Sequence, residues 1–196
     1  MNTVHDFNRD VRRSDRFSTH PIWNWIPSLF YPQCSPPPQR INQASNPEWQ
    51  ECIGADSVWC FPHALHLPPR KRRLLIEEKY RKQTFTDIAL ERVHEYDNGR
   101  RDPGWVELET QADGLLYVTL RIGKAWLINS RALRMAWKQH GAVWQQAYRD
   151  ARSPNPGYWS VSTPVPPEEL LRVLGPSDFL EKDFQPWTKA QVDSCC

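Results

Sequence analysis

The chain has 196 residues, a formal net charge of +2, ten tryptophans, 18 prolines and five cysteines. This length fits one domain that buries roughly 70% of its unfolded surface. No apolar run approaches the ~20 residues of a membrane span, and the N-terminal residues lack the apolar core of a signal peptide, which argues against a membrane partner. The odd number of cysteines favours a reducing, cytoplasmic compartment over a disulfide-stapled secreted fold.

Residues 1–45 are predicted to form an N-terminal extension rich in proline and aromatic residues. Within it, residues 20–31 (HPIWNWIPSLFY) are apolar, and we expect a short helical or irregular segment. Such a segment either covers the core or, where it is exposed, offers a docking surface to a protein partner. Residues 32–46, with three consecutive prolines, are predicted to be a linker-like loop.

The next part of the chain predicts a helix followed by three strands. Asn46 caps a short helix with Pro47 at its first position, and the helix ends near Gly54. Alternating apolar residues then predict strands over residues 55–61, 73–81 and 85–93. Turns are expected at residues 97–99 and 102–105, where Asp, Asn, Pro and Gly cluster.

The C-terminal half predicts a second alternation of helices and strands. A helical turn is expected at residues 109–114, with strands over 115–122 and 125–128. A long helix follows, capped by Asn129 or Ser130, because apolar residues recur at helical spacing. A strand over 158–163 and a helix over 167–175 complete a domain spanning 46–175, and residues 176–196 form a polar tail. The order predicts an α/β (α+β) fold with one mixed sheet.

Chemistry is indicated at the end of the predicted strand over residues 73–81. In an extended strand, Glu77 and Lys79 share one face, while Glu78 and Tyr80 point the other way. A carboxylate and a lysine are costly to bury unless a metal, water or substrate satisfies them. If Asp56 of the preceding strand joins this face, its carboxylate and that of Glu77 offer oxygen ligands to Mg²⁺. Lys79 would then position or deprotonate a water.

Basic residues precede and follow this strand. Arg70, Lys71, Arg72 and Arg73 form a run, and Arg81 lies at the strand's far end. Such a stripe beside carboxylates suits a phosphodiester substrate, because phosphate contacts supply most non-specific affinity for nucleic acids. The alternative is a solvated loop that discourages aggregation at an edge strand.

An ordered set of short motifs resembles the PD-(D/E)XK nuclease superfamily, and in particular a group of uncharacterised phage and bacterial proteins within it. The motifs are GAD (54–56), EKYR (78–81), FTDIALE (85–91), PGW (103–105), DGLLYV (113–118) and LRMAW (133–137). The resemblance implies a core of helix, three strands, helix and strand. It also implies hydrolysis of DNA that depends on Mg²⁺, or Mn²⁺, in the cytoplasm of a bacterium or a phage-infected cell, and a possible homodimer.

Residue by residue, the resemblance implies that Asp56 and Glu77 hold the metal and that Lys79 positions the attacking water. Arg81 and the run from Arg70 to Arg73 would engage phosphates. Other interpretations stay open: Asp56 as a helix-exit cap, and Glu77 with Lys79 as a surface ion pair. A shift of one residue in register would exchange Glu77 for Glu78, and Asp87 and Glu91 are further carboxylates that either join the site or serve turns and ion pairs.

Two further interpretations concern function. A protein with this fold that has lost turnover would act as a nucleic-acid-binding or protein-interaction module, through the basic run or residues 20–31. Separately, Cys52, Cys60, His63 and His66 have spacing compatible with a structural zinc. We favour a buried free thiol at Cys60 instead, because it lies in an apolar strand.

Overall fold

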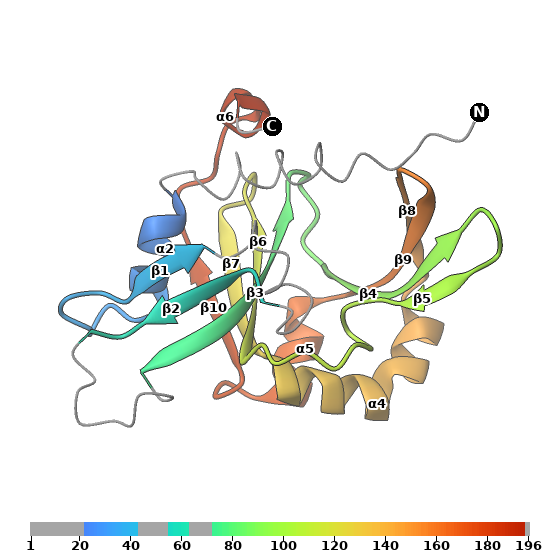
Figure 1. Ribbon diagram of the computed structural model, residues 1–196, viewed down its shortest axis with the longest axis horizontal. Helices are drawn as coiled ribbons and strands as arrows, with labels where there is room; N and C mark the ends of the chain where they lie inside the picture. Colours follow the sequence, from blue (N-terminus) through green and yellow to red (C-terminus); the bar gives the residue numbers. More distant parts are fainter. Residues whose placement is uncertain (1–21, 43–54, 63–71, 195–196) are drawn as a thin grey trace. The chain divides into compact units, whose positions relative to one another are not determined.

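The computed structural model describes residues 22–42, 55–62 and 72–194, which form a mixed α/β fold and confirm the predicted class. The elements, shown in Figure 1, belong to two compact units. We call residues 22–42, 55–62, 72–85, 110–130 and 180–194 the six-stranded unit, and residues 86–109 and 131–179 the four-stranded unit. The prediction of one mixed sheet is therefore wrong, because each unit has a sheet of its own.

The sheet of the six-stranded unit has the order β1-β2-β3-β6-β7-β10. Its strands are β1 (Gln39–Asn42), β2 (Ser57–Cys60), β3 (Arg73–Arg81), β6 (Gly114–Thr119), β7 (Lys124–Asn129) and β10 (Phe179–Asp183). β2 pairs antiparallel with both β1 and β3, and β6 pairs antiparallel with β7. β3 and β6 pair parallel, which makes the sheet mixed and places β3 at its centre.

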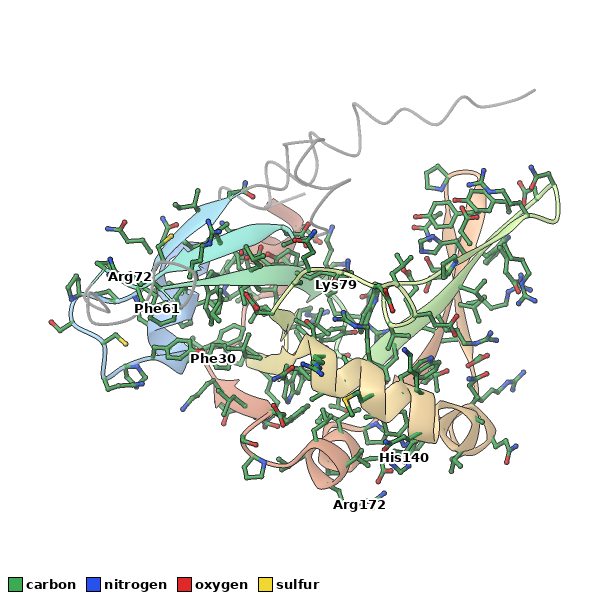
Figure 2. The ribbon with its side chains drawn as sticks, turned by 60° about the horizontal axis from the view of Figure 1, so that its bottom comes forward. Phe30, Phe61, Arg72, Lys79, His140 and Arg172 are labelled. Carbon is green, nitrogen blue, oxygen red and sulfur yellow. The ribbon has the colours of Figure 1, made fainter. Side chains whose placement is uncertain are left out.

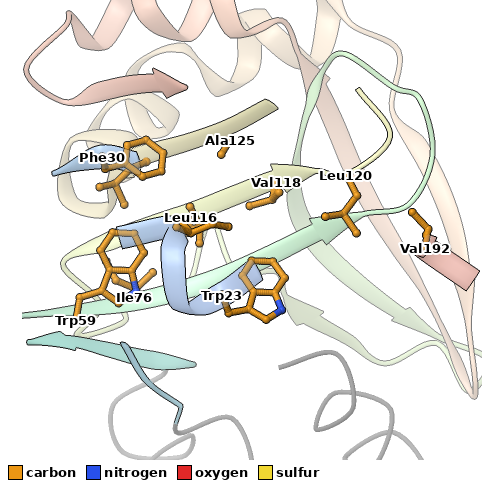
Figure 3. Packing of buried hydrophobic residues seen from close by; sticks show 11 residues of the cluster. Trp23, Phe30, Trp59, Ile76, Leu116, Val118, Leu120, Ala125 and Val192 are labelled. Carbon is orange, nitrogen blue, oxygen red and sulfur yellow. The ribbon is translucent and has the colours of Figure 1, made fainter. Parts of the chain in front are cut away.

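One face of this sheet is covered by α2 (Ile22–Phe30). Trp23, Ile26 and Phe30 recur at helical spacing and are at most 5% exposed, because they pack on the sheet. Figure 3 shows Trp23 and Phe30 among side chains from the strands beneath the helix. Those strand residues include Trp59, Ile76, Leu116, Val118 and Ala125, and Leu120 of the turn after β6 joins them. Residues 20–31 thus contain a helix that covers the core, although Trp25 of that helix remains 39% exposed.

The four-stranded unit has an antiparallel sheet of order β5-β4-β9-β8. Its elements are β4 (Ile88–Tyr96), β5 (Arg101–Pro103), α4 (Ser130–Ala147), β8 (Ala151–Asn155), β9 (Tyr158–Val165) and α5 (Pro167–Leu174). The register of β4 against β9 shifts between Glu91 and Val93, which is a β-bulge. Gly104 packs against this bulge, and a Cβ there would meet the Glu91 carbonyl oxygen at 2.3 Å. The PGW motif therefore requires its glycine.

Trp144 connects the two helices of the four-stranded unit, and Trp137 packs beside it. Trp137 and Trp144 of α4 are buried, with ring centroids 6.3 Å apart. The Trp144 Nε1 donates to Glu169 Oε1 of α5 at 3.0 Å. Arg172 holds the pKa of Glu169 at about 2 by hydrogen bonding, with help from Trp144. His140 stacks on Trp144, and Figure 2 labels His140 on α4 and Arg172 on α5.

The predicted elements differ from the observed ones mainly at the chain's polar segments. The predicted linker over residues 32–46 contains β1, and the predicted polar tail contains β10 and α6 (Lys189–Ser194). β5 replaces part of the turn expected at residues 102–105, and β8 was not predicted. Residues 109–114 contain no helical turn. Each missed strand is three to five residues long, too short for a periodic pattern to appear in its own sequence.

Several predictions lie outside the described residues. These are the helix capped by Asn46 and the positions Cys52, His63, His66, Arg70 and Lys71. Among the described residues, no helix combines the length and the apolarity needed to cross a membrane.

Candidate functional site

The central strand β3 presents two chemically different faces. Ile76 is fully buried in the core beneath α2, and Tyr80 packs against the same core. Because strand residues alternate, Glu78 shares that core-facing side, while Glu77, Lys79 and Arg81 lie on the opposite side. We call the second side the site face. Figure 2 labels Lys79 on this strand.

Asp56 joins β3 immediately before β2 begins. Its backbone N–H donates to the Ile76 carbonyl at 2.9 Å, and its Oδ2 accepts a hydrogen bond from the Glu78 backbone N–H at 2.7 Å. Ser57 pairs with Ile76 in the register of β2 and β3, so the preceding residue, Asp56, lies beside Glu77. Alternation along β2 places Asp56 on the site face.

The three predicted site residues are neighbours, because the register sets Asp56 beside Glu77 and Lys79 pairs with Glu77. Burial raises the pKa of Asp56 above its ordinary value, and the charges of Glu78 and Glu77 raise it further. The ammonium of Lys79 and the Glu78 N–H act in the opposite direction. Lys79 Nζ also forms an ion pair with Glu77 Oε1 at 2.8 Å. The structure therefore brings Asp56, Glu77 and Lys79 together at one end of the β2–β3 pair.

Glu78 lies in a separate environment on the core-facing side. Arg40 of β1 binds its carboxylate with two hydrogen bonds, Nε to Oε1 at 2.7 Å and an Nη to Oε2 at 2.6 Å. Ser57 Oγ donates to Oε1 and Tyr80 Oη donates to Oε2, each at 2.5 Å. We call Arg40, Ser57, Glu78 and Tyr80 the Glu78 cluster. The register thus assigns Glu77, and not Glu78, to the site face.

In the Glu78 cluster, Arg40 keeps its positive charge and Tyr80 stays neutral. Burial acts to lower the pKa of Arg40, but the hydrogen bonds and the charge of Glu78 outweigh it, so the pKa is raised. Burial and the Glu78 carboxylate raise the pKa of Tyr80 well above its ordinary value, so the phenol keeps the proton that it donates. Sequence reasoning missed Arg40 because it lies in the predicted linker. The only sequence signal was Glu78 itself, a carboxylate on a side that the core must cover.

The described part of the basic run lies at the other end of β3 from Lys79. Arg73 begins the strand, six residues before Lys79, which corresponds to about 20 Å of extended chain. Figure 2 shows Arg72 and Lys79 near opposite ends of the strand. Arg81 is closer, two residues beyond Lys79 on the same side, with its guanidinium 5.1 Å from the Phe85 ring. Among the described members of this set (Arg72, Arg73 and Arg81), Arg81 is therefore the nearest to the site.

The remaining candidates belong to other segments of the chain. Asp87 and Glu91 belong to the four-stranded unit, where Glu91 Oε1 is 2.7 Å from His94 Nε2. Cys60 is a half-buried free thiol. Within the described parts of the chain, no group of three or more His, Cys, Asp or Glu side chains is arranged to hold a metal ion.

Comparison of the chain with protein-family models, curated proteins and solved structures finds no match.

Proposed function

We propose that the protein is a metal-dependent nuclease that hydrolyses phosphodiester bonds of DNA, on a core of the PD-(D/E)XK type. The observation that supports the proposal is the meeting of Asp56, Glu77 and Lys79 on one side of the β2–β3 pair. Two carboxylates and a lysine in this order are what the resemblance leads one to expect.

The charges around this site fit a divalent cation. On the site face, two carboxylates (Asp56 and Glu77) stand beside the ammonium of Lys79, and burial first, with the charges of Glu78 and Glu77, raises the pKa of Asp56. Mg²⁺ and Mn²⁺ prefer oxygen ligands and commonly use one or two carboxylates. Asp56 and Glu77 are the carboxylates on the site face that would hold the ion. When bound, the ion would polarise the phosphate and lower the pKa of a water.

Lys79 has the chemistry to organise the attacking water. Its side chain is 36% exposed, so the ammonium can reach substrate and solvent, and Glu77 holds it at 2.8 Å. An ammonium group has three donors. One donor can remain on Glu77 while another orients a water or stabilises the negative charge that develops on the phosphate. Glu77 would therefore both hold the metal and direct Lys79.

DNA binding would use positive charge along the same strand. Arg81 lies on the site face and carries a guanidinium suited to a phosphate. Arg72 and Arg73, about 20 Å along β3 from Lys79, would contact phosphates farther along a bound strand. A single nucleic-acid strand lying along β3 would contact Arg81 at one end of the strand and Arg72 and Arg73 at the other.

The second candidate is a binding module without turnover. The specific observation in its favour is that Glu77 and Lys79 satisfy each other at 2.8 Å, as an ordinary surface ion pair would. Such a module would bind nucleic acid through Arg72, Arg73 and Arg81, or a protein through α2, where Trp25 is 39% exposed.

The decisive experiment measures cleavage of single- and double-stranded DNA with Mg²⁺ or Mn²⁺ and compares the wild type with Lys79→Ala. Lys189→Ala is the matched control, because Lys189 is an exposed lysine in α6. We expect metal-dependent cutting by the wild type and the control, and a rate at least about 100-fold lower for Lys79→Ala.

The other outcomes separate the candidates. A folded wild-type protein that shifts DNA in a gel without cutting it would support the binding module. Equal cutting by Lys79→Ala and the wild type would remove Lys79 from the mechanism. Absence of both cutting and binding would reject a nucleic-acid substrate and direct attention to a protein partner of α2.

A further inference from the structure

We propose that Arg40 is a positioning residue for the site, which acts through Glu78 to hold the carboxylate of Asp56 in place. The proposal rests on the proposed function and concerns a residue outside the motifs that suggested it. It assigns a role to the Glu78 cluster, which the nuclease hypothesis does not otherwise use.

Arg40 and Glu78 are too deeply buried to touch a substrate. Their side chains are only 3% and 2% exposed, respectively. Any influence of Arg40 on catalysis must therefore pass through the residues that it contacts. Its two hydrogen bonds fix both oxygens of Glu78 and leave that side chain a single orientation.

Glu78 in turn connects the central strand to Asp56 and to the residue that follows it. The Glu78 backbone N–H donates to Asp56 Oδ2 at 2.7 Å, and the Glu78 carboxylate accepts from Ser57 Oγ at 2.5 Å. These two bonds run from one residue of β3 to adjacent residues at the start of β2. Through these two bonds, a Glu78 whose side chain is held by Arg40 ties the start of β2 to β3 and restrains the Asp56 carboxylate.

The arrangement is more demanding than packing alone requires. A buried ion pair loses its hydration, and apolar side chains of similar volume often stabilise a protein equally well. Ile76 on the same side of β3 shows that this core accepts an apolar residue. The four hydrogen bonds to the Glu78 carboxylate instead give this residue a defined geometry. The proposed metal ligand that Glu78 contacts, and that would require a defined geometry, is Asp56.

The Glu78 cluster also contacts α2 through Trp23. The Trp23 ring lies 3.9 Å, centroid to centroid, from the Tyr80 ring, and the Arg40 guanidinium lies 5.7 Å from the Trp23 ring. Tyr80 and Arg40 are both donors to Glu78. Residues 22–42 therefore contribute side chains that contact Glu78 and Tyr80 of the central strand, although the sequence predicted an extension outside the domain.

The test uses the full chain with Arg40→Met and Arg40→Lys, and with Arg172→Met as a matched control at an exposed arginine that also pairs with a glutamate. Three quantities are measured: Mn²⁺ affinity by calorimetry without DNA, kcat and KM for DNA cleavage, and DNA affinity without metal. For Arg40→Met we expect Mn²⁺ affinity and kcat to fall about 10- to 100-fold. DNA affinity stays within about twofold of wild type, since the buried guanidinium cannot reach a phosphate.

Arg40→Lys distinguishes directed binding from simple charge. Lysine keeps the positive charge but lacks the planar fork that binds both carboxylate oxygens. We expect this variant to recover part of the Mn²⁺ affinity and kcat lost in Arg40→Met. Tyr80→Phe, which removes one donor to Glu78 and keeps the ring, serves as a milder variant if Arg40→Met does not fold. It should lower kcat and Mn²⁺ affinity less than Arg40→Met, but in the same direction.

The outcomes separate this proposal from the proposed function. If the wild type binds Mn²⁺ and cuts DNA while folded Arg40→Met or Tyr80→Phe matches it in kcat and Mn²⁺ affinity, only the role of Arg40 is overturned. If the wild type neither binds Mn²⁺ nor cuts, both proposals are overturned. If Arg40→Met loses DNA affinity together with kcat, the role of Arg40 is also overturned, because that result would indicate general damage to the fold.

Discussion

Glu77 and Glu78 are adjacent residues of the same type on one strand, yet they occupy opposite environments. Glu78 accepts four hydrogen bonds from Arg40, Ser57 and Tyr80 and is 6% exposed. For Glu77, one side-chain partner, Lys79, is found in the described part of the chain. The alternation of a strand is enough to place one glutamate in the core and the other beside Asp56.

The comparison separates structural charges from candidate catalytic ones. On the core-facing side, one guanidinium with two neutral donors satisfies one carboxylate. On the site face, Lys79 pairs with Glu77 and its charge also acts on Asp56, yet burial keeps the pKa of Asp56 raised. Groups with perturbed ionisation and incomplete charge compensation are characteristic of functional sites. We therefore expect substitutions on the core-facing side to lower mainly stability, and substitutions on the site face to lower mainly activity.

Replacing Glu78 should have the largest effect on stability. Glu78→Ala leaves Arg40 buried without its carboxylate, and breaking a buried pair in this way costs about 3–5 kcal/mol. Urea denaturation followed by circular dichroism would measure the loss. Glu77→Ala is the matched control on the neighbouring position. Equal stability losses for the two variants would contradict the difference between the faces.

Replacing Glu77 should change activity far more than stability. Its ion pair with Lys79 is partly exposed, and such pairs contribute less than about 1 kcal/mol. Glu77→Gln keeps the shape and should unfold within about 1 kcal/mol of the wild type. Metal-dependent DNA cleavage should nevertheless fall at least about 100-fold. A variant that cuts at the wild-type rate would remove Glu77 from the site.

Replacing Asp56 should have the smallest effect on stability, and we expect a neutral or stabilising change at pH 7. A carboxyl whose pKa is raised by folding binds its proton more tightly in the folded state, so its contribution to stability is lost as the pH rises above the ordinary value of 3.8. Asp56 therefore contributes less stability at pH 7 than at acidic pH, and Asp56→Asn should melt at pH 7 at the same temperature as the wild type or higher.

Thermal denaturation across pH tests this sign. The difference between Asp56→Asn and the wild type should shift in favour of the variant as the pH rises from well below 3.8, where Asp56 is protonated in the folded and unfolded states and the difference no longer depends on pH. At neutral pH, addition of Mg²⁺ should raise the melting temperature of the wild type but not that of Asp56→Asn. A variant that is clearly less stable than the wild type at pH 7 would show that the ionised carboxylate supports the fold.

Long periodic segments were predictable because their pattern extends over several turns or residues. The strand over residues 73–81 matches β3, and the predicted long helix matches α4, with Leu133, Trp137 and Trp144 buried as the spacing indicates. β1 and β10 were missed because both are short and mostly polar, and because they form by pairing with strands that are distant in sequence. The residues that follow Pro38 become a strand only because β2 lies beside them.

The sequence by itself determined that Glu77 and Lys79 share a face and that Glu78 opposes them, because side-chain direction alternates in any extended strand. The tertiary structure decided the rest. The register of β2 against β3 brought Asp56 to Glu77, and the pairing of β1 with β2 brought Arg40 to Glu78. These contacts join residues 21 to 38 positions apart. No local pattern specifies them, since they depend on which strands pair and on how the core beneath α2 is filled.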